Sequence, residues 1–176
     1  MSRATPARTR RAGHGRAEDG SVITWSMAEG GRGSRWREVR VAHGAIVSSL
    51  LLELDPEGRF SHLELSTAAG LLTLHPEGDG TLHGNAVGET GVRHVVALPW
   101  SPDEALLVAG SAIARAAAAR VPRRRDGGAA RVGVVVGLDL AVERRALSSA
   151  NLAIELDADG LPALAGGVSW PIELEE

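Results

Sequence analysis

The chain has 176 residues, 44% of them apolar, which is enough for one domain with a sizeable hydrophobic core. It contains no lysine, cysteine or tyrosine, so all 19 basic residues are arginine; this excludes a Schiff-base or P-loop lysine, a thiolate nucleophile or metal ligand, and disulfides. The net charge is −3, and beyond residue 20 the chain carries 14 arginines against 20 acidic residues, an acidic balance that argues against nucleic-acid binding.

Residues 1–20 are rich in arginine, alanine and glycine and have no hydrophobic period. This composition predicts a disordered, solvated tail that precedes a single domain over residues 21–176, with a nucleic-acid or membrane-surface arm as the alternative. The chain has neither the apolar core of a signal peptide nor an uninterrupted apolar run of 18 residues. We therefore expect a soluble cytoplasmic protein that does not span a membrane.

Alternating and β-branched apolar residues predict that most of the chain is β-strand. Two turns, Asp55-Pro56-Glu57-Gly58 and His75-Pro76-Glu77-Gly78, place proline second and glycine fourth, as hairpin turns do. Asp157-Ala158-Asp159-Gly160 repeats the pattern without proline and predicts a third hairpin. The strands expected around these turns cover residues 21–27, 35–42, 45–54, 59–67, 71–75, 80–87, 92–98, 151–156, 161–164 and 168–174.

Two further segments complete the predicted fold. Apolar residues occupy every second position over residues 131–143, which predicts one strand, buried on one side, around which an antiparallel sheet curls. Alanine-rich sequence predicts a helix over residues 111–120, with residues 104–109 either helix or strand. The predicted fold is mainly β: a curled antiparallel sheet, a roll or open barrel, with one helix near residues 102–120.

The sequence offers little reaction chemistry. His62 and Glu64 share one strand face, and a third histidine could complete a metal triad, but this spacing is common on any polar strand face. Gly167-Val168-Ser169-Trp170-Pro171 lacks the last glycine of a nucleophile elbow. We expect no catalytic residue, no metal and no cofactor.

The tryptophans suggest a binding role instead. Most are expected in the core, but Trp36 shares a strand face with Glu38 and Arg40, and Trp100 lies at a strand end. An aromatic ring beside polar groups at the mouth of a curled sheet suits a lipid or sugar. The candidate ligand-binding residues are Trp36, Arg40, His62, His94 and Trp100.

The order of these features resembles the bacterial glycolipid-binding proteins. The matching features are an early tryptophan-containing strand, the segment 36–41, the hairpin 50–65, the strand and glycine-rich turn 72–84, a strand ending in Leu98-Pro99-Trp100-Ser101-Pro102, the late strand 138–144, Asp157 to Leu161, and Trp170-Pro171. The resemblance covers roughly residues 21–176 and implies a roll-like antiparallel sheet without catalytic activity. The chain departs from the family at residues 91–96, where the family carries an acidic pair, and at residues 103–107, where the family is rich in threonine and asparagine.

The function expected from the sequence is the non-enzymatic binding of an amphipathic small molecule, a lipid or glycolipid, in the concave side of the sheet. One alternative is a structural or interaction protein that forms a homo-oligomer through an exposed strand edge. A less favoured alternative is a non-haem metal-dependent oxygenase, which would need His62, Glu64 and a third histidine around one point.

Overall fold

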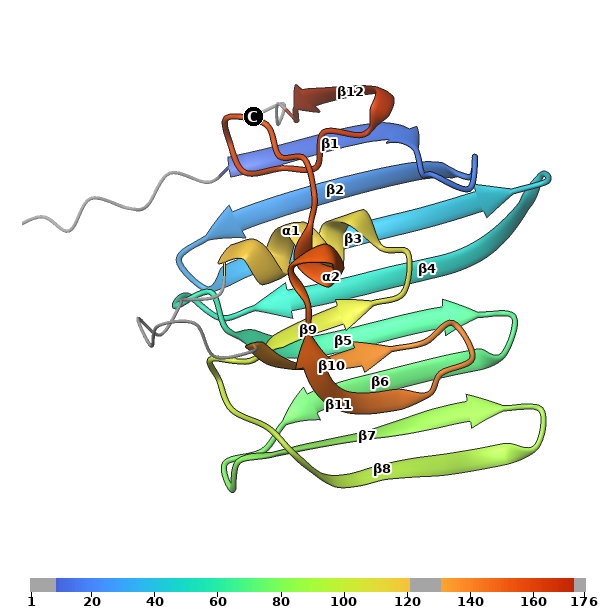
Figure 1. Cartoon of the computed structure of the whole chain (residues 1–176), viewed down its shortest axis with the longest axis vertical. Coiled ribbons are helices and arrows are strands. Elements are labelled where there is room, and N and C mark those ends of the chain that lie inside the picture. The colour runs from blue at the N-terminus through green and yellow to red at the C-terminus, as the bar shows by residue number, and fades with distance from the viewer. Residues whose placement is uncertain (1–8, 121–130, 173–176) are drawn as a thin grey trace, which may run out of the picture.

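The computed structural model describes residues 9–120 and 131–172, and strands make up 61% of it against 8% helix (Figure 1). In chain order the elements are β1 (Thr9–Arg16), β2 (Val22–Gly30), β3 (Gly33–Ala42), β4 (Ala45–Leu54), β5 (Phe60–Thr67), β6 (Gly70–Pro76), β7 (Thr81–Gly88), β8 (Gly91–Pro99), β9 (Ala105–Val108), α1 (Ala112–Arg120), β10 (Arg131–Val136), β11 (Val142–Leu147), α2 (Ser149–Leu152) and β12 (Ala165–Pro171).

Nine of these strands form one large, curled antiparallel sheet that does not close into a barrel. Strands β1 to β8 follow one another in chain order, each paired with the next, and β12 adds to the free side of β1. Short turns after β4 and β6 make this meander possible, because sequential antiparallel strands need only a hairpin connection. The edges of the sheet are therefore β8 and β12.

A second layer lies over one face of the large sheet, which we call the inner face (Figure 1). This layer consists of α1, α2 and a three-stranded sheet in the order β11-β10-β9. Strands β9 and β10 are parallel, and α1 lies between them in the chain, as parallel pairing requires a crossover. Within the described ranges, no helix is long and apolar enough to cross a membrane.

The hydrophobic core fills the space between the two layers. Every second residue of the central strands of the large sheet points inward, as Ile23, Trp25 and Met27 of β2 show, and these side chains are at most 3% exposed. The second layer contributes Ile113 of α1 and Val134 of β10, both fully buried. Because both layers share one core cluster, the position of α1 over the sheet is fixed by side-chain packing.

The structure confirms the predicted fold class, a mainly β, curled antiparallel sheet with one helix near residues 102–120. The seven strands expected between residues 21 and 98 correspond to β2 to β8. The helix begins at Ala112 and ends at Arg120, and the segment left open between helix and strand is the strand β9.

The prediction of a solvated tail is wrong for residues 9–16, which form β1 inside the sheet; residues 1–8 lie outside the described residues. Strand β1 is paired on both sides, with β2 and with β12. Its own side chains supply little apolar surface. The lack of a side chain on Gly13 instead leaves room for the ring of Trp25, since a Cβ atom on Gly13 would lie 2.5 Å from Cζ2 of Trp25. Composition alone could not reveal a strand held by its backbone pairing.

The prediction of one strand over residues 131–143 is also wrong. The chain turns between β10 and β11, where Leu140 has φ 65° and Asp139 accepts a hydrogen bond from the backbone N–H of Ala141. The alternation of apolar residues continues through this turn, so periodicity concealed it. Both strands belong to the second layer and not to the large sheet.

The third predicted hairpin is reduced to a turn. The strands expected over residues 151–156 and 161–164 are absent from the described chain, where α2 and the single bridge between Leu156 and Pro162 stand instead. The turn itself forms as predicted, with the N–H of Gly160 donating to the carbonyl of Asp157. We call residues 153–164 the strap, because this segment crosses the end of the inner face between α2 and β12 (Figure 1).

Candidate functional site

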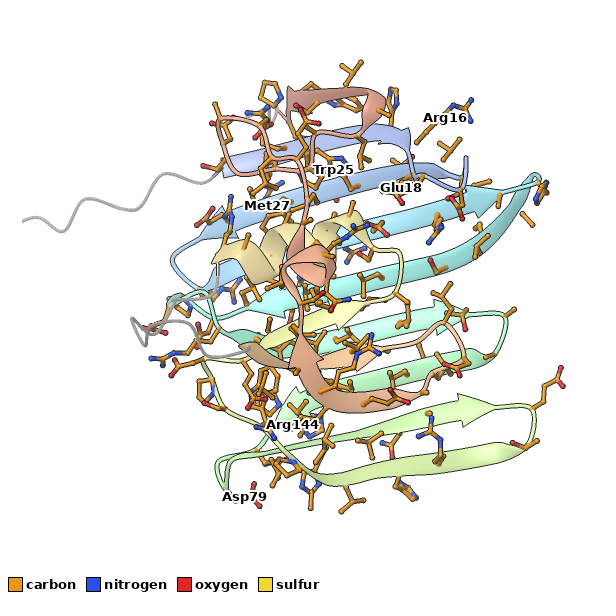
Figure 2. The ribbon with its side chains drawn as sticks, viewed as in Figure 1. Arg16, Glu18, Trp25, Met27, Asp79 and Arg144 are labelled. Atoms are coloured by element: carbon orange, nitrogen blue, oxygen red, sulfur yellow. The ribbon has the colours of Figure 1, made fainter. Side chains whose placement is uncertain are left out.

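A cavity of about 780 Å³ lies on the inner face, between the large sheet, the first turn of α1 and the strap. Its apolar lining includes Ile23 on the sheet, Ala112 on α1, and Ile154 and Leu164 on the strap. Its cationic lining consists of Arg16, Arg40 and Arg115. Figure 2 shows Arg16 at the end of β1 and Glu18 in the turn that follows, at the rim of this site. The volume is within the range typical of small-molecule sites.

The roof of the cavity depends on a carboxylate that caps α1 from the sheet. Oε2 of Glu38, on β3, accepts hydrogen bonds from the hydroxyl of Ser111 (3.1 Å) and from the backbone N–H groups of Ala112 (3.0 Å) and Ile113 (3.1 Å). The hydroxyl of Ser111 in turn accepts from the N–H of Ala114. The first three N–H groups of the helix, which have no partner within it, are thereby all satisfied.

Glu38 is a buried acid, only 3% exposed. Its burial raises the pKa of the carboxyl above its ordinary value, because removal from water disfavours the charged form. The hydrogen bonds from Ile113, Ser111 and Ala112 and the charge of Arg40 lower the pKa, but their effect is smaller. Glu38 is thus a structural group whose protonation is linked to the stability of the fold.

Arg40 forms part of the cavity floor and is 8% exposed. Its Nε donates to the hydroxyl of Ser21 (2.7 Å), and its Nη2 donates to the carboxylate of Asp19. The hydroxyl and backbone N–H of Ser21, followed by the guanidinium of Arg40, lower the pKa of Asp19 to about 2, so this carboxyl is charged at neutral pH. The third nitrogen, Nη1, approaches Gly110 so closely that a Cβ atom there would lie 2.0 Å from it.

Arg115 joins the helix to the strap. Its Nε donates to the carbonyl of Ser111 and its Nη1 to the carbonyl of Ala153, both at 3.3 Å. The same side chain lines a smaller neighbouring cavity of about 250 Å³, which it shares with Gly110 and Arg145. The guanidinium of Arg115 therefore lies between the two cavities, where two backbone carbonyl oxygens accept its hydrogen bonds.

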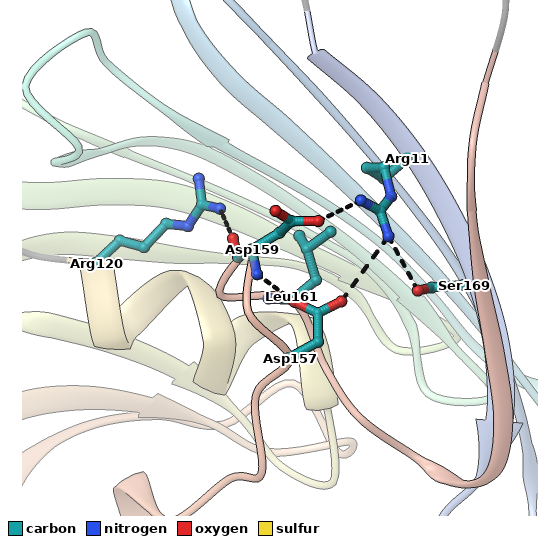
Figure 3. A network of polar contacts seen from close by, with 6 residues as sticks. All are labelled: Arg11, Arg120, Asp157, Asp159, Leu161 and Ser169. Carbon is teal, nitrogen blue, oxygen red and sulfur yellow. Dashed lines mark hydrogen bonds and ion pairs between the residues drawn. The ribbon is translucent and has the colours of Figure 1, made fainter.

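Ion pairs hold the strap against the sheet (Figure 3). Arg11 of β1 pairs with the carboxylate of Asp159 and lies 3.9 Å from that of Asp157, and it donates to the hydroxyl of Ser169 on β12 at 3.1 Å. Arg120, in the last turn of α1, donates to the carbonyl of Asp159 at 3.1 Å. Together with Leu161, which is fully buried in the core, these side chains set the position of the cavity wall.

Of the five ligand-binding candidates taken from the sequence, only Arg40 lines the cavity. Trp36 is fully buried; its Nε1 donates to the hydroxyl of Ser34 (2.9 Å), and the guanidinium of Arg120 lies 4.8 Å from its ring centroid. Trp100 is also in the core, edge-on to Phe60 with ring centroids 5.6 Å apart. Both rings contact protein where the sequence suggested a ligand.

The two histidine candidates lie on the opposite, outer face of the sheet. His62 is 3.1 Å from the carboxylate of Glu64, and Nδ1 of His94 is 2.7 Å from the amide oxygen of Asn85. The structure therefore does not bring the five candidates together. No group of three or more metal-ligating side chains that could hold a metal ion occurs in the described residues.

Sequence reasoning missed most of the lining. Arg16 was assigned to a tail, Arg115 to a helix of unknown orientation, and Ile154 and Leu164 to strands of a hairpin. These residues meet only because the strap crosses the sheet, and no local pattern encodes that crossing. The one available signal was the inward face shared by Trp36, Glu38 and Arg40.

Comparison of the chain with protein-family models, with curated protein sequences and with solved structures gave no match. The resemblance to the glycolipid-binding proteins therefore stays a prediction.

Proposed function

We propose that this protein binds an amphipathic small molecule, a lipid or glycolipid, in the cavity under the strap, without catalysing a reaction on it. The observation that carries the proposal is the composition of this cavity: the apolar side chains of Ile23, Ile154 and Leu164 line it together with Arg40 and Arg115. An apolar surface with a few convergent polar groups is the usual character of a small-molecule site.

The position of the cavity supports a binding role. Its floor is the large hydrogen-bonded sheet, whereas one wall is the strap, which is held by the ion pair of Asp159 with Arg11 and by the burial of Leu161 in the core. The cavity is therefore enclosed by two parts of the chain that the fold holds in place, as a largely pre-formed binding site requires. The cytoplasmic location expected from the sequence remains part of the proposal.

Native mass spectrometry tests this function directly. The protein is purified from its own host and measured before and after extraction with organic solvent. We expect a co-purifying mass that extraction removes and that identifies the ligand class. A bare protein mass in both samples, combined with no uptake of added lipid, would contradict the proposal.

Self-association is a second candidate function, supported by the edge strand β8. Val92 and Val96 on this strand are 58% and 64% exposed. Val92 is in register with Val87, which is in register with Leu71, so an exposed apolar row on the outer face leads to the free edge. Exposed apolar edges favour pairing with another strand, here that of a second copy.

A charge on β8 tests self-association. If two copies pair through β8, Val96→Lys is expected to shift a dimer to monomer, because lysine at an edge opposes strand addition. Sedimentation velocity at matched concentration measures the shift. Ile46→Lys is the control, since Ile46 is 69% exposed on β4, four strands from β8. A wild-type protein that is monomeric throughout would exclude this second candidate.

A further inference from the structure

Two arginines that line the cavity under the strap, Arg115 and Arg16, have no carboxylate partner among the described residues. Within the described residues, the hydrogen bonds of Arg115 go to two backbone carbonyls and to no carboxylate. Those of Arg16 go to the carbonyl of Gly20, at 3.2 Å. A guanidinium bonded only to neutral oxygens keeps its full attraction for an anion.

Arg40 also has capacity to spare. Its Nε and Nη2 are bonded to Ser21 and Asp19, whereas Nη1 has no hydrogen bond to any described residue and lies beside Gly110 at the start of α1. Arg115 reaches the same first turn through its bond to Ser111. Two guanidinium groups thus approach the roof of the cavity from different elements, one from β3 and one from α1.

The acidic residues of the lining do not cancel the charge of Arg115. Asp19 is paired with Arg40 and bonded to Ser21, so it offsets the charge of Arg40 but does not contact Arg115. Glu18 and Glu155 are exposed, so water and salt screen them from a guanidinium inside the cavity. Among the described residues, the cation of the lining that stays available to a ligand beside the first turn of α1 is therefore Arg115.

We propose that the cavity selects amphiphiles with an anionic head group, a carboxylate or phosphate, held by Arg40 and Arg115 while the apolar part contacts Ile23, Ile154 and Leu164. This inference rests on the proposed function and narrows its ligand class. A neutral head group would leave the guanidinium of Arg115 without a charged partner, and a cationic one would be repelled.

A set of amphiphiles with the same twelve-carbon chain tests the proposal by titration calorimetry below their micelle concentrations. The probes are dodecanoate, dodecyl phosphate, dodecyl maltoside and dodecyltrimethylammonium, with inorganic phosphate and acetate as free anions. We expect the two anionic amphiphiles to bind at least about tenfold more tightly than the maltoside, since a charge-assisted hydrogen bond is worth that much.

Each outcome separates the two proposals. Equal binding of the maltoside and dodecanoate would overturn the anion selectivity and leave the binding function intact. Binding of none of the four amphiphiles would overturn both. Inorganic phosphate that binds as tightly as dodecyl phosphate would show a bare anion site and overturn the amphiphile assignment.

Two variants of Arg115 test whether this residue confers the selectivity for an anionic head group. Arg115→Gln is expected to weaken dodecanoate binding at least about tenfold with little effect on the maltoside, and Arg115→Lys to restore part of the loss, because it restores the charge. Arg37→Gln is the matched control, as Arg37 is an exposed arginine of β3 outside the cavity lining. An equal loss for both ligands in Arg115→Gln would indicate that Arg115 only holds the strap, and would overturn its role in charge selection.

Discussion

Replacing Glu38 with alanine is expected to destabilise the protein by about 2–4 kcal/mol, because it leaves the Ser111 hydroxyl and two backbone N–H groups of α1 without an acceptor in a buried site. Glu38→Gln retains an acceptor oxygen and is expected to change the free energy of unfolding by only about 1 kcal/mol. Denaturant titration of the two variants and the wild type measures the difference. Equal losses in both variants would show that the charge of Glu38, and not its hydrogen bonding, is the stabilising element.

The pH dependence of stability provides a second readout for Glu38. Because its pKa is raised in the folded state, the folded protein holds this proton where the unfolded chain has released it. The contribution of Glu38 to stability is therefore greatest below the ordinary pKa of 4.5, falls as the pH rises toward the folded-state pKa, and is constant above it. This fall should be absent in Glu38→Gln, which cannot ionise.

Trp36→Ala is expected to cost about 3–5 kcal/mol of stability, the usual loss when a large buried ring is removed from a core. The substitution would leave a cavity in the core and would also remove the contact between the ring and Arg120. Trp170→Ala, at a site 41% exposed on β12, is the matched control and should cost no more than about 1 kcal/mol. Thermal unfolding followed by circular dichroism compares the two.

The same residue separates a structural role from a binding role. Trp36→Phe keeps an apolar ring and loses the hydrogen bond to Ser34, so we expect about 1–2 kcal/mol of destabilisation and unchanged affinity for dodecanoate. A large loss of affinity in a well-folded Trp36→Phe protein would contradict the placement of Trp36 in the core and favour the ligand role suggested by the sequence.

The large sheet could be predicted because its information is local. In strands β2 to β8, apolar residues alternate with polar ones, and turns such as Asp55-Pro56-Glu57-Gly58 fix where each strand ends. Local patterns also located α1. They failed at β1, whose stability comes from backbone pairing on both sides, and at β10, where an apolar alternation ran through a turn.

Of the residues that form the candidate site, sequence analysis identified one, Arg40. The others are brought together by contacts between residues far apart in the chain. The cap of α1 is an example: the carboxylate that accepts from Ser111 belongs to Glu38, on a strand 73 residues away. The strap likewise meets β1 through Arg11, 148 residues from Asp159. Contacts over such separations depend on the completed fold, so one sequence without the structure cannot reveal them.

The pairing of β12 with β1 has a consequence for how this protein is made. Strands β1 to β8 can pair in order as they leave the ribosome, since each neighbour is separated by a short turn. The outer edge of β1, however, stays unpaired until β12 has been made. Strand β12 lies near the end of the described chain, where Pro171 is in register with Arg11 of β1. Until synthesis reaches that point, the nascent sheet presents an unpaired strand edge, the kind of surface that chaperones shield. Completion of the last strand is then the step that covers the outer edge of β1 and leaves β8 and β12 as the edges of the sheet.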